Sequence, residues 1–172
     1  MTTTTRPEHA PTTTRARRPV PAQIARRIAD TPALWRPLVR FDAAARFATR
    51  LPAASDDHEV WLLTWLPGQG TEWHDHGGSA GAFATVQGVL TEQHATPDQG
   101  GGPAVVVPGA RRLVTGGVRP FGPRHVHHVV NADPVGAVSI HVYAPSLTEM
   151  TEYTRHGSLL HSSGSQLAGV NW

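Results

Sequence analysis

Residues 68–88 read GQGTEWHDHGGSAGAFATVQG, and the spacing of histidine and glycine within them is the most informative feature of the chain. His74 and His76 are separated by one residue, so on an extended strand both imidazoles point to the same side. Neutral imidazole is the commonest metal ligand among the side chains. The pair is therefore a candidate half of a metal site.

A second pair of histidines, His125 and His127, has the same spacing and can face the same cavity from another strand. His128 follows them and points to the opposite face. The chain has 11 histidines and no cysteine, which excludes a disulfide framework and any thiolate–metal site. A histidine-rich site without thiolate suits iron, copper, nickel or zinc.

Short apolar runs separated by glycine or proline occupy the chain after about residue 57, and the chain holds 17 Gly and 15 Pro. Such runs predict strands joined by turns. The predicted strands cover residues 60–66, 82–86, 89–94, 104–107, 112–115, 125–130 and 135–143. Strands of this number and length predict a β-sandwich or barrel.

The remaining segments are assigned by composition. Residues 1–20 are rich in Thr, Pro and Arg and are expected to form a disordered tail, followed by a single domain over residues 21–172. Helical spacing predicts a short helix ending near Asp30 and a second within residues 34–49. Residues 146–156 are expected to form a helix or an irregular lid.

Charge and hydropathy limit the location and the partners of the protein. Basic residues gather at the N-terminus without interleaved aromatic residues, and no known nucleic-acid module follows, so we expect no nucleic-acid partner. There is no apolar core of a signal peptide and no run approaching about 18 apolar residues. A cytoplasmic protein without a membrane partner is expected, while its oligomeric state stays open.

The glycine and histidine frame of residues 68–88 is similar to the first cupin motif, with Gly81 where that motif normally carries Glu. The change suggests three histidine ligands and no carboxylate. The second cupin motif fits His127 and Asn131 in one half but His125 in the other, so spacing leaves both histidines open as the third ligand. The resemblance implies a mainly β cupin fold, a double-stranded β-helix or jelly-roll barrel, with short N-terminal helices.

Three segments resemble bacterial members of the cysteine dioxygenase family: WLPGQGTEWHDHGGS (residues 65–79), VHHVVN (residues 126–131) and VSIHVYAP (residues 138–145). The resemblance covers roughly residues 34–153. It implies an iron(II) held by His74, His76 and His127. It also implies that the enzyme oxidises a small thiol, L-cysteine, to the sulfinic acid with O2.

The same resemblance places Ser139, His141 and Tyr143 beside the iron as catalytic residues, with Ser and His orienting the Tyr hydroxyl. It implies a cis peptide bond at Ala144–Pro145. Some family members crosslink this Tyr to a Cys in the first motif. That crosslink is impossible here because Gly81 holds the position.

Substrate binding is the least defined part of the resemblance. The family clamps the substrate carboxylate with an Arg that precedes the first strand, which favours Arg50 and leaves Arg46 as the alternative. A Gln at this place, typical of 3-mercaptopropionate enzymes, is absent. The alternatives are a dioxygenase for another small thiol, such as 3-mercaptopropionate, and a non-catalytic metal-binding cupin.

Overall fold

The computed structural model describes residues 20–55 and 57–167. The tail predicted over residues 1–20 therefore lies outside the described residues, apart from Val20 at its end. No helix within the described ranges has the length and apolar character needed to cross a bilayer.

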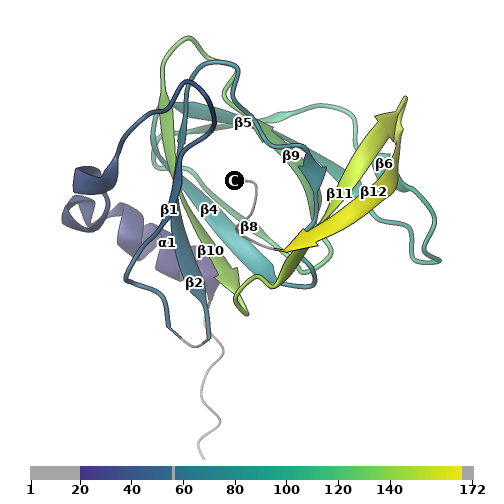
Figure 1. The fold of residues 1–172 in the computed structure, drawn as a ribbon, viewed down its shortest axis with the longest axis horizontal. Coiled ribbons are helices and arrows are strands. Elements are labelled where there is room, and N and C mark those ends of the chain that lie inside the picture. Colours follow the sequence, from purple (N-terminus) through teal and green to yellow (C-terminus); the bar gives the residue numbers. More distant parts are fainter. Residues whose placement is uncertain (1–19, 56, 168–172) are drawn as a thin grey trace, which may run out of the picture.

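The described chain is built mainly from antiparallel strands in two sheets (Figure 1). The first sheet has the order β1-β2-β10-β4-β8 and the second the order β6-β12-β11-β3-β9-β5-β7. The strands are β1 (Ala48–Arg50), β2 (Glu59–Trp65), β3 (Trp73–His74), β4 (Ala80–Gln87), β5 (Val89–Thr96), β6 (Ala104–Val106), β7 (Arg111–Val114), β8 (Val118–Phe121), β9 (Val126–Val130), β10 (Ala137–Ala144), β11 (Glu149–His156) and β12 (Leu159–Leu167). This jelly-roll-like sandwich confirms the predicted mainly β architecture.

The first sheet is covered on its outer face by α1 (Pro21–Ala29), the helix expected to end near Asp30. Leu62 and Ile140 face α1 and share a core with Ile28, whereas Leu63 belongs to the core between the sheets. Neighbouring residues of a strand point to opposite faces, so β2 and β10 serve both cores. The inward face of β10 is the one that carries the predicted catalytic residues.

The helix predicted within residues 34–49 is wrong. The chain forms two short 3₁₀ turns, Pro32–Leu34 and Arg36–Leu38, and then runs into β1. Pro32 is the first residue of one turn and Pro37 the second residue of the other, and proline lacks the backbone N–H that a continuing helix requires. Leu34 and Leu38, which would lie on one face of such a helix, are each 42% exposed.

Residues 146–156 were expected to form a helix or lid, and this expectation is also wrong, because they contribute β11. This strand pairs with β12 in a hairpin at the far edge of the molecule from α1 (Figure 1). Most side chains of both strands are exposed or half-buried, so no apolar alternation reveals them in the sequence. β6 pairs with both β12 and β5 and so closes six strands of the second sheet into a ring.

Candidate metal centre and its pocket

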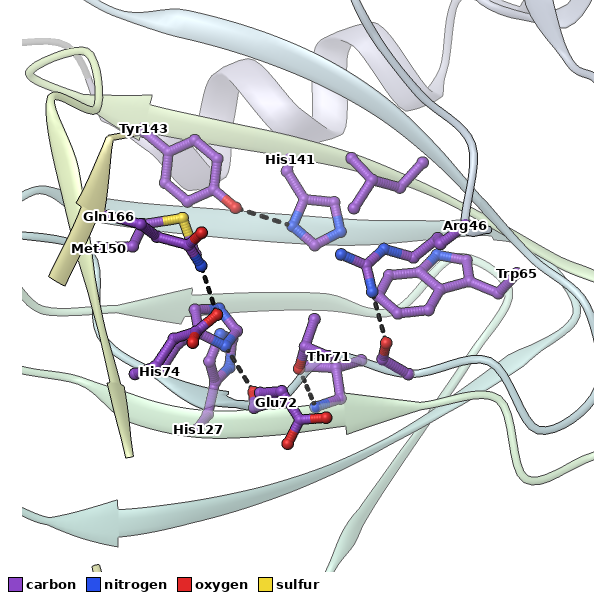
Figure 2. A pocket seen from close by; sticks show the side chains of 14 residues that line it. Arg46, Trp65, Thr71, Glu72, His74, His127, His141, Tyr143, Met150 and Gln166 are labelled. Atoms are coloured by element: carbon purple, nitrogen blue, oxygen red, sulfur yellow. Dashed lines mark hydrogen bonds between the residues drawn. The ribbon is translucent and has the colours of Figure 1, made fainter. Parts of the chain in front are cut away.

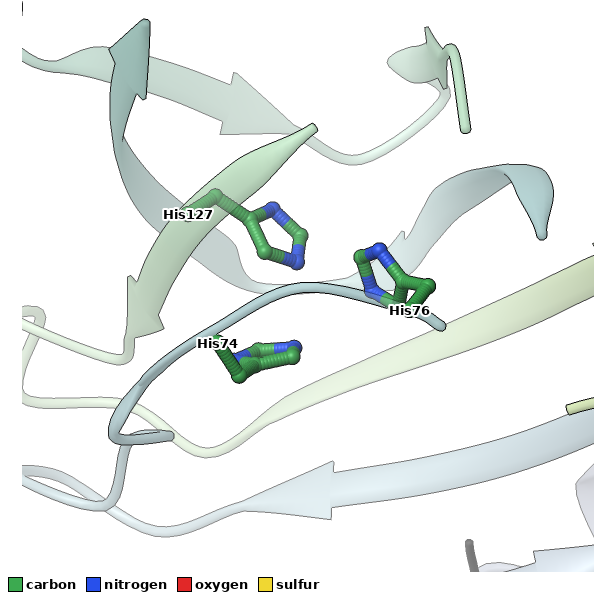
Figure 3. Close-up of side chains that lie close together, drawn as sticks. All are labelled: His74, His76 and His127. Carbon is green, nitrogen blue, oxygen red and sulfur yellow. The ribbon is translucent and has the colours of Figure 1, made fainter. Parts of the chain in front are cut away.

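Three buried histidines converge between the two sheets (Figure 3). His74 lies on β3, His76 in the turn after it, and His127 on β9, and their candidate ligand atoms all lie within 4.8 Å of one another. Antiparallel pairing of β3 with β9 sets His74 directly opposite His127. His125, the alternative third ligand, is outside this group, and it belongs with Glu92 and His127 to a second group of neighbouring candidate ligands.

The side chain between the first two histidines holds their segment in place. Asp75 Oδ1 accepts from the backbone N–H of Gly77 at 3.0 Å and from that of Thr151 at 3.2 Å, and Oδ2 accepts from the Tyr153 hydroxyl at 2.7 Å. β3 ends at His74, so His76 is placed by this turn and not by the strand geometry that the sequence predicts.

In two of these rings, His74 and His127, a hydrogen bond determines which nitrogen is available to bind a metal. His74 Nδ1 donates to the carbonyl of Glu72, and His127 Nδ1 donates to Glu92 Oε1, both at 2.9 Å. In a neutral ring the other nitrogen, Nε2, then carries a free lone pair. Within the described residues neither ring nitrogen of His76 has a hydrogen-bond partner, although both are buried.

Burial also sets the charge of the three rings. It lowers the pKa of His74 and of His76 well below the usual value, and it lowers the pKa of His127 to about 4. All three are neutral near pH 7, the form in which imidazole binds a metal. An unpaired buried polar group costs about 1–3 kcal/mol, so the orphaned nitrogens of His76 fit a bound metal ion.

A cavity of about 250 Å³ opens beside His74 and His127 (Figure 2). Its wall comes from both sheets and from the segment before β1. Arg46 lies in this wall, with its guanidinium carbon 4.7 Å from the centre of the Trp65 ring, and it donates to the carbonyl of Gly70 at 2.5 Å. Burial lowers its pKa to about 10, so the side chain remains a cation near neutral pH.

Arg50, the favoured substrate-binding residue, does not line this cavity. Its side chain is 53% exposed and lies 3.7 Å from Glu59, while Arg46 enters the cavity. No carboxylate of the described residues forms a salt bridge with Arg46, whose buried Nε has no hydrogen-bond partner among those residues. The structure thus separates the two arginines that the sequence left as alternatives.

Ser139, His141 and Tyr143 alternate along β10 and form the expected chain of contacts. The indole of Trp65 donates to Ser139 Oγ at 2.9 Å, Ser139 Oγ lies 2.8 Å from His141 Nε2, and His141 Nδ1 lies 3.3 Å from the Tyr143 hydroxyl. An indole N–H can only donate, so the Ser139 hydroxyl hydrogen is available to His141 Nε2. His141 Nδ1–H then points at the Tyr143 oxygen. The Ala144–Pro145 bond beyond them is cis, as predicted.

Burial keeps this chain of groups uncharged. It lowers the pKa of His141 well below the usual value and raises the pKa of Tyr143. A neutral imidazole and a protonated phenol are the forms that the hydrogen bonds require. Tyr143 thereby presents a hydroxyl, not a phenolate, at the cavity wall.

Two parts of the site have no counterpart in the sequence prediction. Glu92 is a buried carboxylate, and hydrogen bonds from His125, His127 and Arg119 overcome the effect of burial and hold its pKa well below the usual range. Glu92 lies two residues after the buried Leu90 on β5, so the two side chains share a face. This spacing could have indicated a buried carboxylate from the sequence. The β11–β12 hairpin supplies Met150, Glu152 and Gln166 to the cavity wall, with Gln166 donating to Glu152.

The chain was compared with protein families and with curated proteins. The family model described as cysteine dioxygenase type I matches residues 18–156. None of the curated proteins compared with the chain matches it.

Solved structures share the fold. The protein TT1209 from Thermus thermophilus is 20% identical, with 64% of this chain and 93% of that chain covered and a TM-score of 0.53. An uncharacterised conserved protein with a double-stranded β-helix domain from Klebsiella pneumoniae is 19% identical, with 76% and 84% covered and a TM-score of 0.51. At these identities the likeness establishes the double-stranded β-helix fold and carries no information on activity.

Proposed function

Since this chain belongs to the cysteine dioxygenase type I family, we propose that it is an iron(II)-dependent dioxygenase that converts L-cysteine and O2 to cysteine sulfinic acid. One observation carries the proposal. A buried group of three neutral histidines opens onto a cavity that also contains an arginine without a carboxylate partner among the described residues.

His74, His76 and His127 are the residues that would hold the metal. When bound, iron(II) would supply the redox chemistry that O2 requires and would lower the pKa of a coordinating thiol. The chain supplies three neutral nitrogen donors and no carboxylate in this group. Fe(II) is favoured over other metals by the family, since imidazole ligands alone also suit copper, nickel and zinc.

Arg46 is proposed to bind the substrate carboxylate. A planar guanidinium can donate two parallel hydrogen bonds to a carboxylate, and this pairing is stronger in a cavity than in water. Stacking on Trp65 and the hydrogen bond to Gly70 hold the side chain in place before substrate arrives. The role assigned to Arg50 by sequence therefore passes to Arg46 in this proposal.

Tyr143 is proposed to donate a hydrogen bond into the cavity. The hydrogen-bond order from Trp65 through Ser139 and His141 places a donor, His141 Nδ1–H, against the Tyr143 oxygen. The phenol hydrogen is then directed away from His141. Because burial raises the pKa of Tyr143, the phenol stays protonated and serves as a donor to substrate or oxygen.

Oxygen uptake by the iron(II)-loaded protein tests the function. We expect uptake with L-cysteine, matched by cysteine sulfinate, and weaker activity with cysteamine, which has no carboxylate for Arg46. Uptake with 3-mercaptopropionate alone would reject L-cysteine as the substrate but would still support a thiol dioxygenase. Stoichiometric iron without uptake for any thiol would reject the enzyme and favour a metal-binding cupin.

A further inference from the structure

Glu92 on β5 is a buried carboxylate that contacts the histidine group and is hydrogen-bonded through both of its oxygens. Its side chain has no exposed surface. Oε1 accepts from His125 Nε2 and from His127 Nδ1, both at 2.9 Å, and Oε2 accepts from Arg119 Nε at 2.6 Å. One carboxylate therefore receives hydrogen bonds from three donors on β8, β9 and the turn before β9.

Strand pairing brings these groups together. Glu92 lies opposite Val129 in the β5–β9 register, so His127 is its diagonal neighbour, and diagonal neighbours on one face are within reach of long side chains. A buried carboxylate is costly unless a positive charge and further hydrogen bonds compensate it. Arg119, with 18% of its side chain exposed, supplies that charge.

We propose that Glu92 is a positioning residue for the metal centre, which fixes His127 in the tautomer that presents Nε2 to His74 and His76. The inference rests on the proposed metal site and adds a residue to it. Ligating histidines commonly donate their other N–H to a carboxylate, and this contact orients the ring and raises its basicity.

The direction of each hydrogen bond follows from the chemistry of Arg119. A guanidinium nitrogen only donates, so it requires an acceptor oxygen on residue 92. Glutamine at this position would have one oxygen and one NH2 group. Because Arg119 would donate to the amide oxygen, the NH2 group would face His127 Nδ1. That nitrogen would then have to accept a hydrogen bond. The ring proton would then sit on Nε2, the atom that must bind the metal.

This argument also defines a rescue. Arg119 donates through Nε, and in glutamine the amide oxygen and nitrogen occupy the same place along the side chain. In the double variant Glu92→Gln, Arg119→Gln, the amide of residue 119 can accept from the NH2 group of residue 92. The oxygen of residue 92 is then free to face His127 and restore the original tautomer.

Cobalt(II) binding to the metal-free full chain is the test, followed by the visible absorption of the bound ion, with folding checked by circular dichroism. We expect Glu92→Gln to weaken cobalt affinity about 10- to 100-fold. The double variant should regain a large part of that loss. A folded Glu92→Gln protein with wild-type affinity would overturn the inference. Failure of the wild type to bind cobalt would instead overturn the proposed metal site.

A second measurement needs no variant. Nitrogen-15 NMR of the metal-free wild type reports the tautomer of each imidazole. We expect His127 to carry its proton on Nδ1, where Glu92 accepts it. A proton on Nε2 of His127 would contradict the inference even if the variants fail to fold.

Discussion

Phe121 lies directly over Gly81: the two residues are partners in the pairing of β8 with β4, and a Cβ on Gly81 would come 2.5 Å from Phe121 Cζ. The same ring stacks on His76, with centroids 4.6 Å apart. Position 81 is where the cupin motif usually carries Glu. Here the residue is Gly, so β4 gives the histidine group no carboxylate, and the Phe121 ring occupies the adjacent space.

Adding one methyl group at this contact should therefore destabilise the protein. For Gly81→Ala we expect a loss of about 1–3 kcal/mol in the free energy of unfolding, because neither the Phe121 ring nor the nearby Val142 carbonyl can withdraw freely. Urea denaturation measures it. Gly122→Ala is the matched control, since a Cβ there meets nothing within 4 Å, and should stay within about 0.5 kcal/mol. Equal stability of the two variants would show that the ring moves aside.

The two arginines provide a paired test of the carboxylate clamp. Arg46→Met should lower kcat/KM for L-cysteine about 10- to 100-fold, the loss of a hydrogen bond to a charged group. Arg50→Met should change it little, since Arg50 lies outside the cavity. Steady-state oxygen uptake gives both values, and cysteamine serves as the substrate without a carboxylate. An Arg50→Met protein with the larger defect would reverse the assignment.

Loss of the Tyr143 hydroxyl should affect turnover and not metal binding. We expect Tyr143→Phe to lower kcat about 10- to 100-fold through the loss of a placed donor. Ser139→Ala should give a smaller decrease, because it acts through His141. Iron content and single-turnover rates separate the effects. A fall in iron content equal to the fall in rate would argue for a structural role alone.

His76 allows a test of the metal site that does not depend on activity. Its buried nitrogens have no partner among the described residues, so His76→Leu should leave the metal-free protein at least as stable as the wild type. The increase in Tm on adding iron(II) or cobalt(II) should disappear, because a bound ion stabilises only the form that holds it. His128→Leu, outside the three-histidine group, should keep the increase. Stabilisation by metal in His76→Leu would exclude this ligand.

Sequence predicted the histidine group because its signals are local. Because side chains of a strand alternate between its two faces, His125 and His127 are predicted on the same face, and the family resemblance then favours His127. The structure places His127 beside His74 and His76. The buried strands were visible from their apolar runs, as for β2 and β10. The cis bond at Ala144–Pro145 was likewise implied by the resemblance.

The remaining features depend on contacts that spacing along the chain does not encode. Arg46 enters the cavity because the segment before β1 is irregular, and a helical prediction could not choose between it and Arg50. Glu92 acquires its role only through its contacts with Arg119 and the histidines of another strand. The β11–β12 hairpin shows no apolar alternation because solvent covers most of both faces.

The β11–β12 hairpin contributes to the cavity but carries none of the three clustered histidines. It follows all three histidines in sequence, yet its side chains Met150, Glu152 and Gln166 form one wall of the cavity. Asp75 anchors it to the histidine segment through Thr151 and Tyr153. The backbone of β11 also pairs with β3, where Glu152 lies opposite His74, so side chains of the hairpin can be exchanged while this pairing and the Asp75 anchor are kept. In the proposed enzyme, substrate preference can therefore evolve, or be redesigned, through side chains other than the three histidines.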